Sequence, residues 1–533
     1  LVINTTNNAQ VTLGGSLTVA NTLSFQSNGK LSLSNYTLTL QGSVVNTVAG
    51  RLTGSTNATI EVTGNASPTL SFDQVVTNGN ALKKLGINTT GVVSLASNLT
   101  LVNTTSAAGL AITNGKLSIG SNTLTIKNAS SIINTVAGGI TGGSTSNLIV
   151  EGTVNRTLSF DQTQPGVSNV LNNFSVATTG NNTTSIANDV VVNGTLNVNA
   201  GEVLDMTTAS MTGTPTAITL NGLLQTQSMS ATPLPANANW TGTGKVDYNG
   251  SVSTSPQTAV GGSFYNLAIS NATGGAKASG NIAVSNQLSL SNNPAANRGS
   301  LEMTIDYADY ATVSSRTSPD STGLATPLNN YYNKLNSYIL DLGASATTVG
   351  TGDVTGKVRR STIVAGVEYS FGHPSNSITF SNNGTLPSSI TFITKVGAAY
   401  HLIDTSVNRH YQIIRAGGTT TNTFTVKLRY LESEVHGNDI GNENKLVLWD
   451  HHIPYGGVTP HMHGKTSQSL AERWIALSGH SVTYLCDSTA YEAGTFAKYW
   501  SVNQANTTNN FTWLGAVPGA SNWNVASNWN GGV

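Results

Sequence analysis

Charge is scarce in this chain, and the little that is present is balanced. Charged residues make up 9% of the 533 positions, with 24 basic and 24 acidic side chains, whereas an ordinary soluble domain has about a quarter. A chain without net positive charge offers no electrostatic surface to nucleic acid or to anionic membranes. The composition therefore predicts that neither of them is a partner.

Cysteine and long apolar runs are scarce as well. The single cysteine, Cys486, excludes an intramolecular disulfide and a zinc site built on several thiolates. No segment approaches the roughly 18 consecutive apolar residues that a membrane-spanning helix needs, so we expect a protein that does not span a membrane.

Short alternating runs fill the first 300 residues. Apolar residues alternate with Thr, Ser or Asn, as in residues 36–40 and 116–119, and Asn-Gly, Gly-Gly or Ser-Asn pairs separate the runs. Alternation with a period of two predicts half-buried β-strands joined by turns.

An internal repeat of 88 residues is the stronger signal. Residues 45–50 return as residues 133–138, and residues 69–74 return as residues 157–162, both 88 positions later, and a weaker copy covers residues 246–269. Repeats built of short strands predict a parallel β-solenoid (β-helix) over residues 1–300, with roughly 20–25 residues per coil and on the order of 13 coils. A string of β-sandwich domains of about 88 residues is the alternative.

A solenoid also accounts for the composition. Each coil would bury an inward row of Leu, Val and Ile, and outward Thr, Ser and Asn would stack on their own kind along the sheet. Like charges stacked every ~4.8 Å would repel one another, so few charges are expected.

The second part of the chain has a different character. Residues 301–533 hold 30 of the 48 charged residues and 25 of the 34 aromatic ones. Residues 301–350 lose the repeat, which predicts a transition or capping segment. Residues 351–505 carry longer alternating strands with aromatic positions, which predicts an antiparallel β-sandwich of immunoglobulin-like or jelly-roll-like type.

The two ends suggest that the chain continues. Residues 1–5 already have the pattern of a strand, and residues 506–533 are rich in Asn and Trp, which predicts a junction to a next module. Trp513, Trp523 and Trp529 are the candidates for the contact at this junction. We expect a section of a longer polypeptide.

Four of the nine histidines lie within 13 positions: His451, His452, His461 and His463. His461 and His463 are two apart and could face one side of a strand, where neutral imidazoles could ligate Zn²⁺, Cu²⁺ or Ni²⁺. A surface hairpin with incidental histidines is the alternative.

An oxygen-rich loop covers residues 437–444. Asp439 and Glu443 stand among asparagines there, which makes them candidate Ca²⁺ ligands by ligand type alone, because the spacing departs from that of an EF-hand. An ordinary Asx-turn loop is the alternative, and no cofactor is required by the sequence.

The usual signatures of catalysis are lacking. No Gly-x-Ser-x-Gly elbow precedes a helix, and the glycine-rich residues 138–143 are not followed by the Lys-Ser/Thr of a phosphate loop. Asp73 and Asp161 occupy equivalent positions of successive repeats, which predicts a turn or capping role, since a catalytic pair would be unique. The chain is therefore predicted to have no enzymatic activity.

Five segments resemble a known family. Residues 246–250 (Val-Asp-Tyr-Asn-Gly), 352–356 (Gly-Asp-Val-Thr-Gly), 408–411 (Asn-Arg-His-Tyr), 428–434 (Leu-Arg-Tyr-Leu-Glu-Ser-Glu) and 522–529 (Asn-Trp-Asn-Val-Ala-Ser-Asn-Trp) are similar to repeats and modules of giant β-solenoid surface proteins and adhesins of the Bacteroidota. The resemblance implies an extracellular filament or adhesin exported by the type IX route.

These observations together predict an extracellular, non-enzymatic structural or adhesive protein, a section of a surface filament or stalk. Its expected partners are polysaccharide or other surfaces, and further modules of the same polypeptide or copies of itself. A self-assembling filament or surface-layer subunit is one alternative, and a β-helix enzyme acting on polysaccharide is another.

Overall fold

The computed structural model describes residues 1–5, 9–46, 50–105, 108–134, 137–178, 180–251, 253–292, 299–303, 338–396, 406–435, 442–453, 459–492, 497–505, 512–513 and 529–530. The fold is nearly all β, with 55% strand and 3% helix, and consists of a parallel β-solenoid of about 14 turns and an antiparallel part toward the C-terminus. The predicted fold class is therefore confirmed. The chain forms two compact units, Leu1–Asn249 and Gly250–Val533.

The first unit consists of short strands connected by turns. Its strands are β1 (Val2–Thr5), β2 (Gln10–Thr12), β3 (Leu17–Val19), β4 (Leu23–Ser27), β5 (Lys30–Ser32), β6 (Thr37–Leu40), β7 (Val44–Asn46), β8 (Leu52–Thr53), β9 (Ser55–Gly64), β10 (Thr69–Leu70), β11 (Ala81–Leu95), β12 (Leu99–Asn103), β13 (Ala108–Ser118), β14 (Thr123–Asn128), β15 (Ser131–Asn134), β16 (Ile140–Thr141), β17 (Asn147–Gly152), β18 (Arg156–Leu158), β19 (Val170–Leu171), β20 (Asn173–Thr178), β21 (Thr183–Ile186), β22 (Val190–Val192), β23 (Thr195–Val198), β24 (Val203–Asp205), β25 (Met211–Thr212), β26 (Ala217–Leu220), β27 (Leu223–Thr226), β28 (Ala238–Thr241) and β29 (Lys245–Tyr248).

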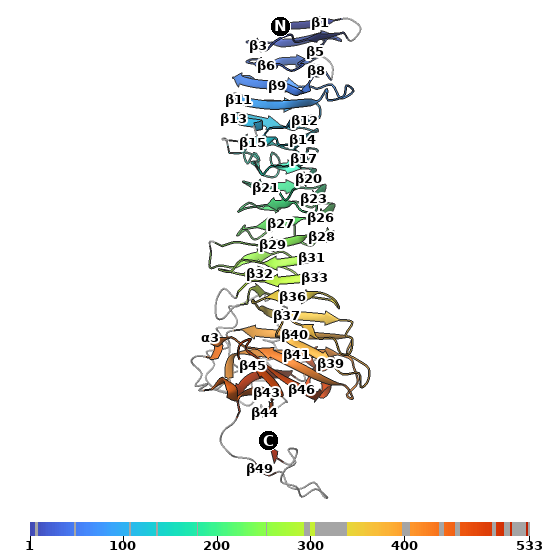
Figure 1. Cartoon of the computed structure of the whole chain (residues 1–533), viewed down its shortest axis with the longest axis vertical. Coiled ribbons are helices and arrows are strands. Elements are labelled where there is room, and N and C mark those ends of the chain that lie inside the picture. The colour runs from blue at the N-terminus through green and yellow to red at the C-terminus, as the bar shows by residue number, and fades with distance from the viewer. Residues whose placement is uncertain are drawn as a thin grey trace. The chain divides into compact units, whose positions relative to one another are not determined.

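These strands pair in parallel with the strand one coil away (Figure 1). In one ladder β12, β14, β17, β20, β23, β26 and β28 follow one another. Leu124 pairs with Leu148, 24 residues on (148 − 124), and Leu196 pairs with Ile218, 22 residues on (218 − 196). The coil length thus agrees with the value expected from the sequence.

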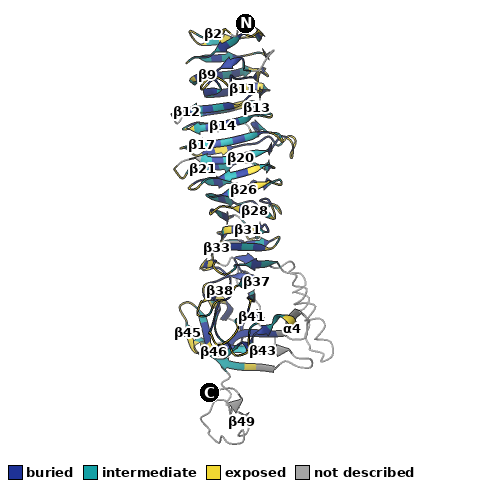
Figure 2. Cartoon of the chain, turned by 90° about the vertical axis from the view of Figure 1, so that its right-hand side faces the viewer, coloured by how far each residue is buried: buried dark blue, intermediate teal, exposed yellow. Residues whose placement is uncertain are grey.

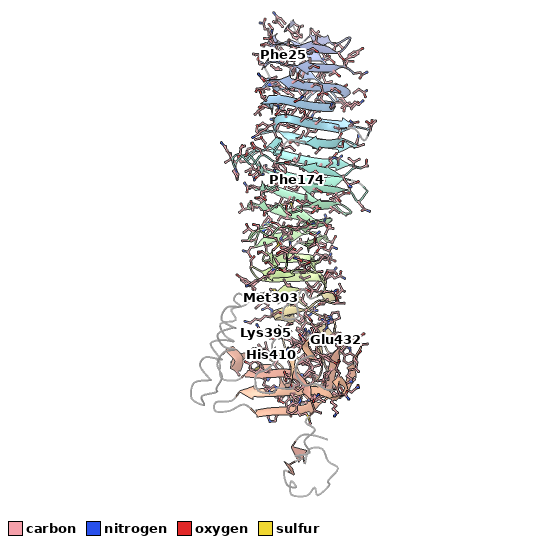
Figure 3. The ribbon with its side chains drawn as sticks, turned by 90° about the vertical axis from the view of Figure 1, so that its left-hand side faces the viewer. Phe25, Phe174, Met303, Lys395, His410 and Glu432 are labelled. Carbon is pink, nitrogen blue, oxygen red and sulfur yellow. The ribbon has the colours of Figure 1, made fainter. Side chains whose placement is uncertain are left out.

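Inward side chains of this ladder form one continuous apolar row. Its members are 0–1% exposed, and Phe174 among them is labelled in Figure 3: Leu99, Leu124, Leu148, Phe174, Leu196 and Ile218. Burying one such side chain contributes about 1.5–3 kcal/mol. Each coil is therefore held mainly by the coils on either side of it.

The outward positions alternate with the inward ones, as Figure 2 shows for β12, where buried and intermediate residues take turns. One outward row of the same ladder is uncharged over seven consecutive strands: Thr100, Thr125, Ile149, Ser175, Asn197, Thr219 and Thr241. Charge repulsion between coils is thereby avoided along this face.

The 88-residue repeat corresponds to four coils. Leu52 is bridged to Phe72, and Ile140 is bridged to Phe160 in the same parallel manner, with 140 − 52 and 160 − 72 both equal to 88. Both phenylalanines are fully buried. The sequence repeat therefore places Phe72 and Phe160, and the similar Leu52 and Ile140, at equivalent inward positions four coils apart.

The second unit contains further strands and, within the described residues, four short helical segments: β30 (Gln257–Ala259), β31 (Gly262–Ile269), β32 (Ala276–Ala278), β33 (Ile282–Leu290), β34 (Leu301–Glu302), β35 (Ile339–Asp341), β36 (Thr347–Gly350), β37 (Val354–Ser361), β38 (Tyr369–Ser370), β39 (Ser377–Phe380), β40 (Ser389–Val396), β41 (Ser406–Ala416), β42 (Thr423–Arg429), α3 (Glu432–Val435), η1 (Glu443–Lys445), β43 (Leu446–Ile453), β44 (Thr459–Gly464), β45 (Ser467–Ser469), β46 (Trp474–Ser481), η2 (Val482–Tyr484), β47 (Cys486–Asp487), α4 (Ser488–Glu492), β48 (Ala497–Gln504), β49 (Thr512–Trp513) and β50 (Trp529–Asn530).

Parallel pairing continues in the second unit past residue 300. Strands β33 and β36 pair in parallel, and β37 pairs in parallel with both β34 and β35. The boundary predicted at residue 300 thus lies inside the parallel series, and residues 301–350 contribute strands to it. The sequence obscured this continuation because the residues between β34 and β35 interrupt the coil period; of these, 304–337 lie outside the described residues.

Strand β37 is where the pairing changes from parallel to antiparallel. Its other edge pairs antiparallel with β40, and β41, β48, β43 and β44 follow in one sheet, while β38, β39, β42, β46 and β45 form a second antiparallel sheet. Aromatic rings connect the two sheets: Phe371 stacks on Phe392 with centroids 4.0 Å apart, and Phe424 meets Trp500 edge to face at 6.2 Å. This is the predicted β-sandwich.

Candidate functional site

A cleft with a volume of about 850 Å³ opens in the second unit beside α3, and we call it the α3 cleft. Its walls come from the end of β36, the turn between β38 and β39, the end of β42 with the start of α3, and the connection from β45 to β46. The lining residues are Gly350, Thr351, His373, Pro374, Ser375, Arg429, Tyr430, Leu431, Glu432, Ser433, Ala471, Glu472 and Arg473.

Behind the α3 cleft lies a buried ion-pair network of two arginines and two carboxylates. Arg409 Nη2 donates to Asp353 Oδ2 at 2.8 Å, and its Nε donates to both oxygens of Glu434 at 3.0 Å. Arg429 Nη1 lies 2.8 Å from the same Asp353 oxygen. The side chains of Arg409 and Asp353 are 0% exposed. Such charges are stable inside a protein only because they are paired with one another.

The network changes the acidity of its members. Burial alone would raise the pKa of Asp353, but the attraction of Arg409 and Arg429 outweighs it and lowers that pKa. Burial, joined by the charge of Asp353, raises the pKa of Glu434. Burial, opposed by the charge of Asp353 and assisted by those of Arg429 and Arg409, lowers the pKa of His373 to about 3, so this imidazole is neutral at pH 7.

Hydrogen bonds connect this network to the walls of the α3 cleft. Glu434 Oε2 accepts from the backbone N–H of Leu431 at 2.8 Å, and Asn376 Oδ1 accepts from the backbone N–H of Arg429 at 2.9 Å. His373 Nδ1 accepts from the backbone N–H of Ser375 at 2.9 Å. Two of the lining segments, the turn between β38 and β39 and the end of β42 with the start of α3, are thereby fixed in position before any ligand arrives.

The rim of the α3 cleft carries one ion pair and one carboxylate that accepts from an indole. Arg473 Nη2 donates to Glu432 Oε2 at 2.7 Å, and Trp474 Nε1 donates to Glu472 Oε2 at 2.6 Å; Glu432 is labelled in Figure 3. Within the described part of the chain, Nε of Arg429 and Nε of Arg473 are buried and have no hydrogen-bond acceptor. The lining therefore carries carboxylate acceptors beside guanidinium groups whose Nε atoms lack an acceptor among the described residues.

The histidines predicted as a group are brought close to one another only in part. His461 Nδ1 and His463 Nε2 lie 3.3 and 3.2 Å from the same oxygen of Asp450, whose side chain is 0% exposed. His451 is engaged elsewhere, with Nε2 at 2.8 Å from Ser501 Oγ. His461 and His463, two positions apart in the sequence, therefore do face the same side of their strand. What they share there is the buried carboxylate of Asp450 on the neighbouring strand.

His463 also lies among aromatic rings. Its ring centroid is 5.0 Å from that of His480 and 5.2 Å from that of Trp500. Burial lowers the pKa of His480, and the charge of His463 lowers it further, while Asp450 opposes both effects. His463 is thus packed into the β-sandwich, unlike a loop histidine.

The predicted cation ligands do not form a metal site in the part of the chain that is described. No group of three or more His, Cys, Asp or Glu residues is placed there to hold a metal ion. Glu443 Oε2 accepts from the hydroxyl of Tyr430 at 3.0 Å. Asp439 and the side chain of His452 lie outside the described residues.

The repeat-equivalent carboxylates have the turn role predicted for them. Asp73 Oδ1 accepts from the backbone N–H of Val75 at 2.8 Å, and Asp161 Oδ1 accepts from that of Thr163 at 2.9 Å. Each also pairs with a lysine, Lys30 at 2.5 Å and Lys116 at 2.7 Å. Both carboxylates therefore fix a turn of the solenoid.

Of the junction tryptophans, Trp513 and Trp529 stand opposite each other in the antiparallel pair of β49 and β50. Their side chains and Trp523 lie outside the described residues. Their role as a junction stays a prediction.

The ion-pair network was not predicted from the sequence. Asp353, Arg409 and Glu434 come from three separate segments, and Arg409 stands in strand β41, which also holds a second arginine, Arg415. In a chain with 9% charged residues, a charge inside a strand is a signal that could have been used.

Comparisons with protein-family models, with curated proteins and with solved structures give no match for this chain. Among the described residues, none of the helices has the length and apolar character needed to cross a membrane. The function of the chain must therefore follow from its fold and from the chemistry of its surfaces and its cleft.

Proposed function

We propose that this chain is a section of an extracellular, non-enzymatic stalk or adhesive filament that attaches to polysaccharide or other surfaces. The observation that carries the proposal is the series of parallel ladders, in which the inward row from Leu99 to Ile218 runs through consecutive coils without a polar interruption. Coils stacked in this way resist bending and proteolysis, because the strands of each coil are hydrogen-bonded to those of the coils on either side.

The outward rows support an adhesive role. The seven positions from Thr100 to Thr241 carry no charge, and all but the buried Thr125 present hydroxyl, amide or methyl groups, on strands stacked ~4.8 Å apart. Single contacts of this kind are weak, but many identical contacts on one chain add up to firm attachment.

The resemblance of residues 246–250 and 352–356 to giant surface proteins supports an extracellular location and export by the type IX route. The balanced charge of 24 basic and 24 acidic residues also suits a neutral glycan surface better than an ionic partner.

The repeat itself provides the test. Deletion of residues 53–140 joins Leu52 to Thr141 in register and removes one repeat of four coils, about 19 Å of stack. Beads coated with the full chain, or with this shortened chain, would be pressed against films of cellulose and of chitin, and the rupture force would be measured in an optical trap. The variant Leu148→Asp, which places a charge in the inward row, is the control for loss of the coils.

If many contacts along the coils share the attachment, the shortened chain should still fold and keep at least about half of the rupture force. The variant Leu148→Asp should lose most of that force. Failure of the full chain to adhere to either film would refute the adhesive proposal. Complete loss of adhesion in a folded deletion variant would refute the spread contact, because it would locate attachment at a single site within residues 53–140.

A further inference from the structure

We propose that the α3 cleft is a binding site for a neutral, hydroxyl-rich glycan. This inference rests on the proposed function, because the α3 cleft would be the defined site at which the attached polysaccharide is recognised. It goes beyond the spread contact of the coils, because the α3 cleft occurs within the β-sandwich and uses side chains that the solenoid repeat does not contain.

The size and rigidity of the α3 cleft fit a ligand site. Its volume of about 850 Å³ falls within the range of roughly 300–1,000 Å³ that small-molecule sites occupy. The ion-pair network holds Arg429 through its ion pair with Asp353 and Leu431 through the hydrogen bond from its backbone N–H to Glu434. A wall fixed in advance reduces the entropy that binding would otherwise cost.

The charge of the lining selects against anions. Arg429 and Arg473 contribute two positive charges, Glu432 and Glu472 contribute two negative ones, and His373 is neutral because its pKa is lowered to about 3. Arg429 is already paired with Asp353, and Arg473 is already paired with Glu432. An acidic ligand would therefore find both arginines already paired, while Glu472 accepts only from the indole of Trp474.

The hydrogen-bonding groups of the lining select for hydroxyls. Arg429 is 9% exposed, and within the described residues its Nε has no acceptor, as is also true of Nε in Arg473. Carboxylate oxygens of Glu432 and Glu472 and the hydroxyls of Ser375 and other small residues provide acceptors close to these donors. A sugar hydroxyl both donates and accepts, so neighbouring hydroxyls can use the two kinds of group together.

The test is titration of the full chain with neutral hexasaccharides, namely cellohexaose, laminarihexaose and mannohexaose, and with hexagalacturonate as the acidic comparison. Affinity would be measured by calorimetry, and the place of binding by hydrogen exchange of residues 429–433 and 471–473. Two variants change the α3 cleft, Arg473→Gln at the rim and Ala471→Trp to fill it. The matched control is Arg359→Gln, which removes an arginine paired with Asp341 away from the cleft.

We expect at least one neutral hexasaccharide to bind and to protect both segments, with affinity reduced roughly tenfold or more in Arg473→Gln and in Ala471→Trp and unchanged in Arg359→Gln. Binding of none of the neutral sugars, tighter binding of hexagalacturonate, or unreduced affinity in both cleft variants would each overturn the inference. The bead assay separates this result from the proposed function, because the deletion of residues 53–140 leaves the α3 cleft intact. If beads coated with Ala471→Trp adhere as strongly as beads coated with the unmodified chain, the proposed adhesive function stands and the α3 cleft is refuted as its recognition site.

Discussion

Replacing Arg409 by methionine tests whether the buried ion-pair network stabilises the β-sandwich. Methionine keeps most of the apolar stem and removes the guanidinium, which makes two bonds to Glu434 and one to Asp353. Asp353 would keep Arg429 as a partner. Glu434, whose side chain is 1% exposed, would lose the cation that its buried carboxylate contacts.

The expected cost follows from this burial. Breaking a fully buried ion pair from one side destabilises a protein by about 3–5 kcal/mol, because an uncompensated charge is left behind. The matched control is Arg359→Met, which breaks the pair with Asp341. There the arginine side chain is 42% exposed, and pairs exposed to this degree contribute only about 0–1 kcal/mol.

Hydrogen exchange read by strand is the suitable assay, since a chain of two units need not unfold in a single step. In Arg409→Met the opening free energy of β41 and β42 should fall by about 3–5 kcal/mol, while that of β14, β17 and β20 in the first unit stays unchanged. In the double variant Arg409→Met/Glu434→Gln the unpaired charge is gone, so at least about 1 kcal/mol should return.

The reasoning would be refuted by a loss in Arg409→Met no larger than that in Arg359→Met. It would also fail if Glu434→Gln gave no recovery in the double variant, because the cost would then come from lost packing and have nothing to do with the charge.

Three further predictions concern acidity and packing. The folded-state pKa of His373, about 3, lies below the unfolded value of about 6.5. The neutral imidazole therefore contributes its full stability above about pH 6.5 and loses it as the pH falls toward 3. The opening free energy of β39 should drop by up to about 1.4 kcal/mol per pH unit below about pH 6, and His373→Asn should flatten this slope. Leu148→Ala should lower the opening free energy of β17 by about 2–5 kcal/mol, whereas Ser175→Ala on the outward face should change it by less than about 0.5 kcal/mol; equal effects would contradict the inward row. Burial would raise the pKa of Asp161, but Lys116 and the turn N–H groups lower it overall, so Asp161→Asn should cost about 1–2 kcal/mol at pH 7, and this difference from the unmodified chain should vanish as the pH falls through the folded pKa.

Much of the first unit could be predicted from the sequence because its contacts repeat at short range. Phe72 and Phe160, 88 residues apart in the sequence, are buried at equivalent positions, and Asp73 and Asp161 fix equivalent turns. The spacing of His461 and His463 likewise predicted that they share one side of a strand. It could not identify Asp450 as their shared contact, since that carboxylate belongs to a neighbouring strand.

The sequence by itself determined the class of fold, the coil length of the solenoid and the neutral character of its outward face. The reason is physical: a coil packs only against its neighbours, so the period of apolar residues contains nearly all the information that stacking needs. Tertiary structure alone decided the α3 cleft and its network. Asp353 and Arg409 are 56 residues apart, and Arg409 and Glu434 are 25 apart, so nothing local joins them. These residues meet because two antiparallel sheets pack over one core. A single charge buried in that core would be unstable without an opposite charge beside it.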